Sequence, residues 1–253
     1  MDFRELDAWL TALLDPASLA SIDDSLNGIQ VARSEGEVTR VAFAVDASLE
    51  TIRRAAEAGA QVLVVHHGLF WGGAARMDGA LRARVKLLLD SDLALWACHL
   101  PLDRHPEVGN NAVLASMLGL VDLEPFGVYH GVALGLKGRF AEPITLEAAI
   151  ARVLPDGSAP NCLIPAGPAL VKTAGLASGG AALEAFQAIN QGLDLYLTGE
   201  TSHSIYSAIV ESRTTFVAAG HYRTEVHGVK AVAARLSRET GLETLFIDLP
   251  TGL

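Results

Sequence analysis

The sequence predicts an α/β fold made of two intertwined, similar α/β domains from an internal duplication, each a mixed sheet flanked by helices. Apolar runs of strand length alternate with amphipathic segments of helical spacing, which is typical of β-α-β units. Residues 41–68 and 172–200 repeat one order of elements: strand, small-residue turn, helix closed by glycine, strand and polar tip. A further helix and an apolar strand follow in both halves, so duplication explains the pattern better than chance.

The elements expected in the first half follow from the spacing of apolar residues and from the residues that end a helix. Helices are expected at 3–14, 48–59, 80–92 and 109–120, and strands at 29–31, 38–46, 61–67 and 93–101. Gly59 closes the second helix. We expect Asn110 or Asn111 to cap the fourth helix, because a short polar side chain accepts hydrogen bonds from free backbone amides.

The second half becomes rich in glycine from about Tyr129, and residues 130–140 predict a strand or hairpin. Helices are then expected at 145–154, 181–192, 203–212 and 224–241, and strands at 169–178, 193–200, 214–221 and 242–250. The last helix and strand could return to the first half. We therefore expect one domain from residues 1–127 plus about 222–253, and a second from residues 128–221.

Composition restricts the class of protein. With 253 residues, of which 50% are hydrophobic and 19% charged, the chain fits a globular protein with one large or two medium domains. The net charge of −10 disfavours a nucleic-acid-binding surface. An acidic N-terminus without a signal peptide, and no apolar run long enough for a membrane span, predict a cytoplasmic protein. Cys98 and Cys162 are then expected to be reduced thiols.

The stretch VLVVHHG carries the strongest chemical signal, because a buried strand delivers His66 and His67 side by side. Adjacent side chains of a strand point to opposite faces, so both can serve one site only where the strand ends, and Gly68 permits that turn. Ligands of α/β sheets bind at such strand ends. The repeat also aligns the ends of two other strands. It places His99 opposite His221 and Asp103 opposite Glu225, and in each half the histidine and the carboxylate are four residues apart.

The carboxyl ends of these three strands could converge on one metal site. The candidate ligands are imidazoles and carboxylates: His66, His67, Asp103, His221 and Glu225. Five protein ligands are more than one catalytic zinc ion takes, and they suit two divalent ions about 3.5–4 Å apart, bridged by a carboxylate. Zn, Fe, Mn, Ni and Co are all compatible with this donor set.

The roles of several neighbouring residues stay open. His99 could orient a ligand or water, move protons, or be a strand histidine bonded to backbone. Glu200, which the repeat aligns with His67, could be a general base, orient a ligand, or be an acid at a helix N-terminus. Phe70 and Trp71 could form an aromatic wall for a flat ring or could pack in the core. The chain has no GxxxxGK[ST], GxGxxG, GxSxG or CxxC motif, which disfavours nucleotide-loop enzymes and serine hydrolases.

Four blocks of the sequence, HHGLFW, CHLPLDRHPEVGNNAVLA, YLTGE and AGHYRTEVHGVKAVAARL, resemble the signature blocks of the NGG-one-interacting-factor-three-like family. SLNGIQV resembles its N-terminal block, and the similarity covers nearly the whole chain in the same order. Bacterial members are named GTP cyclohydrolase 1 type 2 homologues. The resemblance implies two intertwined α/β domains, a dinuclear metal centre and a ring-shaped homohexamer. The family's metal ligands fall on the five residues named above.

Two classes of function follow. The first is a metal-dependent hydrolase, GTP cyclohydrolase 1 type 2-like by resemblance, in which two bridged metals activate water and His99 or Glu200 moves protons. Its substrate would be a nucleotide or a phosphorylated small molecule, and Arg139, Arg213 and Arg223 could neutralise phosphates or be surface charges. The second is a non-catalytic metal-binding scaffold or metal carrier that acts through protein partners.

Overall fold

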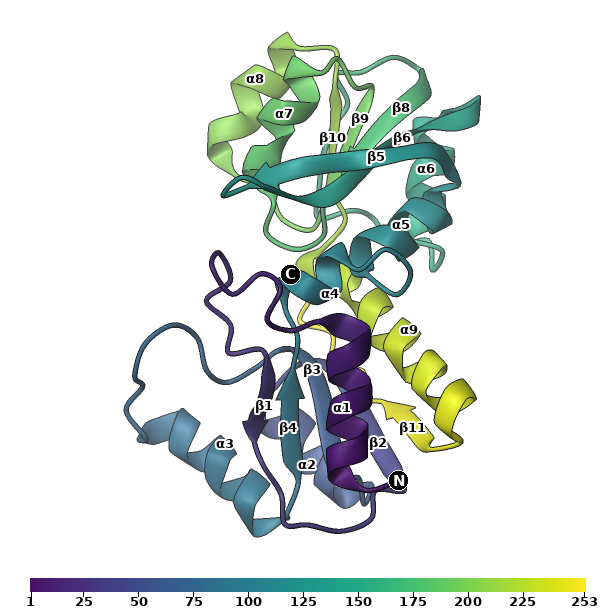
Figure 1. The fold of residues 1–253 in the computed structure, drawn as a ribbon. Coiled ribbons are helices and arrows are strands. Elements are labelled where there is room, and N and C mark those ends of the chain that lie inside the picture. The colour runs from purple at the N-terminus through teal and green to yellow at the C-terminus, as the bar shows by residue number, and fades with distance from the viewer. The chain divides into compact units, whose positions relative to one another are not determined.

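A computed structural model describes residues 1–253, which form two compact units (Figure 1). The first unit comprises Met1–Leu102 and Gly228–Leu249, and the second comprises Asp103–His227 and Pro250–Leu253. The chain therefore leaves the first unit, builds the second and returns, which makes the two α/β domains intertwined. Residues 103–127, which the sequence assigned to the first domain, belong to the second unit.

The first unit contains a five-stranded mixed sheet in the order β1-β4-β3-β2-β11. Its strands are β1 (Gly28–Val31), β2 (Arg40–Asp46), β3 (Val62–His67), β4 (Ala94–Ala97) and β11 (Glu243–Phe246). β11, β2, β3 and β4 run parallel, and β1 pairs antiparallel with β4 at the edge. The carboxyl ends of β2, β3 and β4 thus meet at one edge of the sheet.

Helices cover both faces of this sheet. They are α1 (Phe3–Leu14), α2 (Leu49–Glu57), α3 (Gly79–Asp90) and the larger part of α9 (His221–Thr240). Ile52 of α2 and Leu88 of α3 pack against Leu63 and other apolar residues of one face. On the opposite face, Trp96 donates a hydrogen bond from Nε1 to Asp7 Oδ1 of α1 at 2.9 Å, and Figure 1 shows α1 lying across that face.

The second unit contains a six-stranded mixed sheet in the order β5-β6-β8-β9-β10-β7. Its strands are β5 (Leu120–Tyr129), β6 (Val132–Thr145), β7 (Cys162–Ile164), β8 (Leu170–Leu176), β9 (Leu195–Thr198) and β10 (Thr215–Ala218). β8, β9 and β10 are parallel, β7 pairs antiparallel with β10, and β5 and β6 form an antiparallel hairpin that joins β8.

Helices again lie on both faces. They are α5 (Asn110–Leu118), α6 (Leu146–Val153), the 3-10 turn η1 (Ala182–Glu184) with α7 (Ala185–Asn190), and η2 (His203–Ile205) with α8 (Tyr206–Glu211). Leu114 of α5 and Val153 of α6 pack on the face that includes Leu197. Ala188 of α7 and Ile209 of α8 pack with Tyr196, whose side chain points the other way along β9.

The two sheets support the predicted duplication. β2, β3 and β4 of the first unit correspond in order and direction to β8, β9 and β10 of the second. The antiparallel edge strands β1 and β7 also correspond, since each pairs with the last strand of its parallel set. The sheets differ on the other side, where β11 is parallel to β2 but β6 is antiparallel to β8.

Sequence reasoning missed some elements. β7 and β5 were not predicted, because neither shows a clear apolar alternation of its own. α9 begins at His221 rather than near residue 224, and a short helix, α4 (Leu100–Arg104), follows β4 where a longer strand was expected. No helix of the structure is both long and apolar enough to cross a membrane.

Candidate metal centre

His66 and His67 end β3, and each has its Nδ1 atom fixed by an oxygen. His66 is fully buried, with Nδ1 2.9 Å from the carbonyl oxygen of Cys98. His67 is partly exposed, with Nδ1 2.9 Å from Oδ1 of Asp46, the last residue of β2. A carbonyl and an ionised carboxylate only accept hydrogen bonds, so both imidazoles carry their proton on Nδ1. Nε2 is then the nitrogen with the lone pair that a metal needs.

His99, two residues beyond β4, is held in the same way. Its Nδ1 donates to Oδ1 of Asp23 at 2.9 Å, and its backbone amide donates to Oδ1 of Asn27 at 2.9 Å. Asp23 also accepts from the side chain of Asn27 and the backbone amide of Leu100. Burial raises the pKa of Asp23, but the hydrogen bonds from His99 and Asn27 outweigh burial and hold that pKa below its ordinary value. Asn27 therefore helps to position both Asp23 and His99.

The three histidines of the first unit form a group. The ring centroid of His66 lies 4.6 Å from that of His67 and 5.1 Å from that of His99. One nitrogen from each ring lies within 4.8 Å of the others, so the group could hold a metal ion. Neutral imidazoles suit Zn, Fe and Ni, and the Nδ1 hydrogen bonds are of the kind that orient metal-binding histidines. The donor set of the first unit therefore fits a divalent metal.

In the second unit, His221 and Glu225 lie one turn apart on α9. His221 Nε2 is 3.1 Å from Glu225 Oε2, and His221 Nδ1 is 2.6 Å from Oε1 of Glu200, which follows β9. The sequence placed His221 at the end of a strand and Glu225 in the first turn of the following helix. The structure puts both residues on α9, and the spacing of four residues brings their side chains onto one face.

The charges around His221 affect its protonation. Burial lowers the pKa of His221, but Glu225 and then Glu200 outweigh it and raise the pKa to about 9. Without a metal, the imidazole is therefore protonated at neutral pH. Because a metal ligand must be deprotonated, metal binding by His221 would release a proton.

Asp103, on α4, is buried and positioned by neighbouring side chains. Its Oδ1 accepts from Asn110 Nδ2 at 2.9 Å and from Ser178 Oγ at 2.8 Å. A carboxylate oxygen of Asp103 and one of Glu225 lie within 4.8 Å of each other. Predicting Asn110 or Asn111 as a helix cap was wrong: Gly109 is the N-cap residue of α5 and no side chain caps that helix. The Asn111 amide instead donates to the carbonyl oxygen of Asp103.

Sequence reasoning missed Gly179, although a pair of glycines such as Gly179–Gly180 is a recognisable signal of a turn. Its φ of +66° lies in the left-handed region, and a Cβ atom there would overlap Oε1 of Glu225. Its amide donates to Thr224 Oγ1 at 3.0 Å. Its carbonyl oxygen accepts from the amide of Glu200 at 3.1 Å. Glycine thus lets the loop after β8 approach the Glu225 carboxylate closely.

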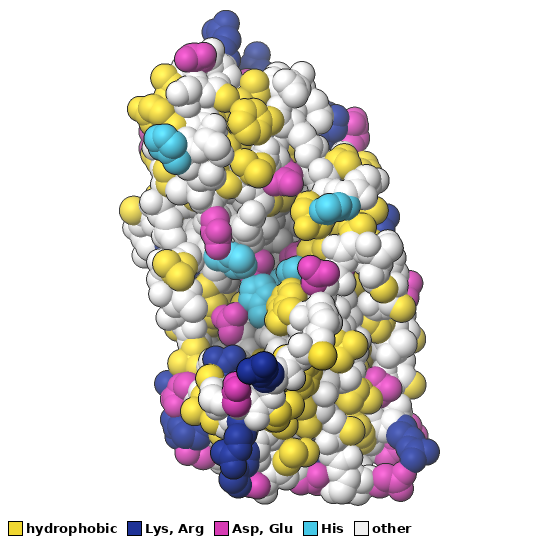
Figure 2. Space-filling view, turned by 90° about the vertical axis from the view of Figure 1, so that its left-hand side faces the viewer, with side chains coloured by type: hydrophobic (Ala, Val, Ile, Leu, Met, Phe, Trp, Pro, Cys, Tyr) yellow, Lys and Arg dark blue, Asp and Glu magenta, His cyan; other side chains and the backbone are white.

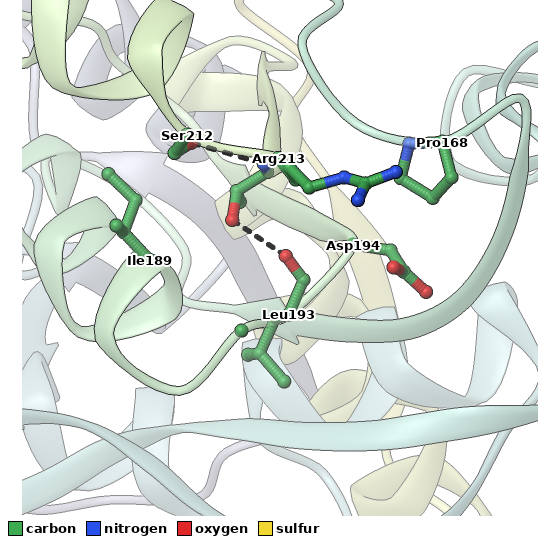
Figure 3. Close-up of a pocket in the computed structure, with 8 residues that line it drawn as sticks. Pro168, Ile189, Leu193, Asp194, Ser212 and Arg213 are labelled. Carbon is green, nitrogen blue, oxygen red and sulfur yellow. Dashed lines mark hydrogen bonds between the residues drawn. The ribbon is translucent and has the colours of Figure 1, made fainter.

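Two of the arginines considered as phosphate ligands have other partners in the second unit. Arg139 pairs with Asp122, and Arg223 donates to Ser158 Oγ and Asn161 Oδ1. Arg213 lines a hollow of about 430 Å³ (Figure 3).

The hollow lies at the amino ends of β9 and β10, because its lining residues Asp194 and Thr214 directly precede these strands and Arg213 is next to Thr214. Glu200 and His221 follow the same strands. Arg213 therefore lies at the opposite end of the strands from the candidate site, which favours the alternative reading of a surface charge.

The surface in Figure 2 shows Lys and Arg side chains lying among Asp and Glu side chains, and histidine side chains that reach the surface. Ion pairs also occur on α2, where Arg53 contacts both Glu50 and Glu57. Acidic side chains therefore interrupt the basic ones, whereas nucleic acids bind clustered basic side chains.

Comparisons with known proteins give one consistent result. The family model described as Duf34/NIF3 (NGG1p interacting factor 3) matches residues 1–251. A Pyrococcus horikoshii protein named GTP cyclohydrolase 1 type 2 homolog is 43% identical over 256 residues, covering 100% of both chains.

Two solved structures, each covering 100% of both chains, have the same fold. "Structural genomics, protein ybgI, unknown function" is 34% identical with a TM-score of 0.90. The crystal structure of TTHA1606 from Thermus thermophilus is 40% identical with a TM-score of 0.88. The fold, the histidine and carboxylate groups and the match over nearly the full length agree, and the chain belongs to the Duf34/NIF3 family.

Proposed function

We propose that this protein binds two divalent metal ions through His66, His67, Asp103, His221 and Glu225, and that it is a metal-dependent hydrolase. The observation that carries the proposal is the anchoring of the histidines: in all three proposed histidine ligands, Nδ1 contacts an oxygen that can fix the ring. Such contacts orient metal-binding imidazoles and raise their basicity. The relative's name, GTP cyclohydrolase 1 type 2 homolog, suggests a nucleotide substrate.

The donor chemistry supports two ions. Three imidazoles and two carboxylates exceed the needs of one catalytic zinc ion, and this number of donors would suit two divalent ions. When bound, such ions lower the pKa of water and polarise the bond to be cleaved. Zn, Fe, Mn, Ni and Co remain compatible with the donor set.

Several residues position these ligands. Asp46 holds His67, and Asn110 with Ser178 holds the carboxylate of Asp103. Glu200 contacts Nδ1 of His221, so we assign it the positioning of that ring rather than the transfer of a proton to substrate.

His99 is our candidate for proton transfer. Because its Nδ1 donates to Asp23, its Nε2 has the lone pair that can accept a proton. The buried carboxylate of Asp23 would stabilise the imidazolium that forms, as an Asp–His pair does in a hydrolase. His99 would then return that proton to the leaving group.

The assembly and location of the protein are also proposals. The family resemblance of the sequence supports a ring-shaped homohexamer. The two cysteines, Cys98 and Cys162, form no disulfide, which supports a reducing compartment such as the cytoplasm.

The test begins with protein purified without chelator. Elemental analysis should find about two divalent ions per chain, as expected for a dinuclear site. A screen with GTP, other nucleotides and phosphoesters should reveal hydrolysis that stops after chelation and returns with one divalent metal. Activity that is indifferent to chelator would refute the metal-dependent hydrolase. Two bound ions without any hydrolysis would favour the metal scaffold or carrier.

A further inference from the structure

Trp71 is an exposed aromatic residue next to the histidines of the first unit. Its ring centroid lies 4.8 Å from that of His99 in an edge-on arrangement of 76°, and 6.0 Å from that of His67. The side chain is 41% exposed. A large apolar side chain that is held at the surface beside a candidate reaction site is more informative than one in the core.

The backbone around Trp71 is firmly tied. Its Nε1 donates to the carbonyl oxygen of Gly68 at 3.0 Å, and the residue forms an isolated β-bridge with Ser25. Gln30 Oε1 accepts from the amides of Leu69 and Phe70 at 2.6 and 3.2 Å. A Cβ atom on Gly68 would overlap the Gln30 amide, so glycine at this position leaves room for the Gln30 hydrogen bonds. The indole is therefore presented by an ordered turn.

Phe70 and Trp71 have different roles in packing. Phe70 is partly buried and packs against the core cluster that includes Leu63 and Leu95. Trp71 is not part of that cluster and keeps much of its surface in solvent. The core therefore accounts for Phe70, and it does not account for a tryptophan at position 71.

We propose that Trp71 is a specificity-determining residue whose indole stacks on the planar heterocyclic ring of the substrate. This inference rests on the proposed function, because it places the substrate at the histidines of that site. An indole offers a broad π-face, and stacking on a protein aromatic ring recognises nucleobases by their shape. The ring contact with His99 places the indole next to the residue that we assign to proton transfer. The substrate class is thus an aromatic nitrogen heterocycle, such as a purine nucleotide.

The test compares ring-containing and ring-free probes on metal-loaded protein. GTP, ATP and guanosine carry the heterocycle, and inorganic triphosphate does not. Trp71→Phe is used as the blank that isolates the fluorescence of Trp71, since Trp9 and Trp96 remain. We expect GTP to quench the emission of Trp71. We also expect Trp71→Ala to weaken GTP binding by roughly tenfold to a hundredfold, the usual range for loss of one stacking partner.

Matched readouts separate stacking from a structural role. Trp71→Ala should leave triphosphate binding and metal content unchanged, and Trp71→Phe should restore most of the GTP affinity. Trp9→Phe, at a partly buried tryptophan of α1, should leave binding unchanged. If none of the ring-containing probes quenches Trp71, or if Trp71→Ala binds GTP as well as the wild type, the stacking role is overturned.

Metal content distinguishes the two proposals. Loss of metal in Trp71→Ala would show a structural role for the indole and would also overturn stacking as its function. Wild-type protein that binds no metal but still shows quenching of Trp71 by GTP would contradict the metal site and keep the stacking role.

Discussion

The Nδ1 atom of His221 lies 2.6 Å from Oε1 of Glu200, although the two residues follow different strands of the second unit. Glu200 follows β9, and His221 follows β10 and begins α9. β9 and β10 are parallel neighbours, so their carboxyl ends deliver both residues to the same edge of the sheet. This pairing turns Nε2 of His221 toward Glu225 and suggests the first of five tests.

Glu200→Gln should weaken metal binding by about 10- to 100-fold, as loss of a carboxylate behind a metal-binding histidine does. The substitution removes one of the charges that raise the pKa of His221, so that pKa should fall below about 9 in the metal-free protein. Metal titration and NMR of the histidine ring measure the two effects. Glu211→Gln, an exposed change on α8, is the control, and equal metal affinity in both variants would contradict the positioning role.

Glu225→Gln should reduce the metal content from two ions to one or none per chain. Glu225 is 2% exposed, and glutamine has nearly the same size as glutamate, so loss of charge is the main change. Elemental analysis after purification without chelator measures the stoichiometry. An unchanged metal content would refute Glu225 as a ligand.

Gly179→Ala should displace the Glu225 carboxylate and lower metal content, because the added methyl group would occupy the space of Oε1. Gly192→Ala is a matched control: its φ of +65° is nearly the same, but no atom lies within 4 Å of its added Cβ. Both variants should lose about 1 kcal/mol of stability from left-handed strain. Only Gly179→Ala should also lose metal, and equal metal retention would argue against the close packing.

Asp23→Asn should destabilise the protein by about 1–3 kcal/mol at neutral pH, because charge-assisted hydrogen bonds to a buried carboxylate are lost. The pKa of Asp23 in the folded protein is below the ordinary value of 3.8, so its stabilisation is present above that value. This contribution disappears as the pH falls through the lower folded-state pKa. The free energies of unfolding of the wild type and Asp23→Asn, measured with urea, should therefore converge in strong acid. A difference that stays constant with pH would contradict this. Asp24→Asn, an exposed neighbour, should have little effect.

Tyr196→Phe tests how a buried tyrosine of the second unit affects stability at alkaline pH. Burial, followed by the charge of Glu184, raises the pKa of Tyr196 well above 10. The unfolded chain loses its phenolic proton near pH 10 while the folded protein retains it, so wild-type stability should fall as the pH rises above 10. The variant lacks this group and should lose less stability there, apart from about 1 kcal/mol at neutral pH for the hydrogen bond to Ala181. Parallel pH profiles in urea unfolding would contradict the prediction.

The sequence by itself determined the elements whose signals are local. Apolar spacing predicted β2-α2-β3 and β8-α7-β9, and the run VLVVHHG placed His66 and His67 at the end of a strand. The carboxyl ends of parallel strands lie at the same edge of a sheet, where ligands bind, so those histidines formed a candidate site. The family blocks were also readable because they are contiguous in the chain.

Tertiary structure decided what depends on partners distant in the chain. Asn110 looked like a helix cap, but the fold brings its amide to Asp103; the nearness of Gly179 to Glu225 also depends on chain folding across many residues. β7 is a strand because it pairs with β10, and its few residues carry no periodicity that would reveal it. Local spacing reports which face of an element is apolar, whereas hydrogen-bond partners are chosen by packing between elements. That is why most strands could be predicted from the sequence, and the residues that hold the candidate ligands could not.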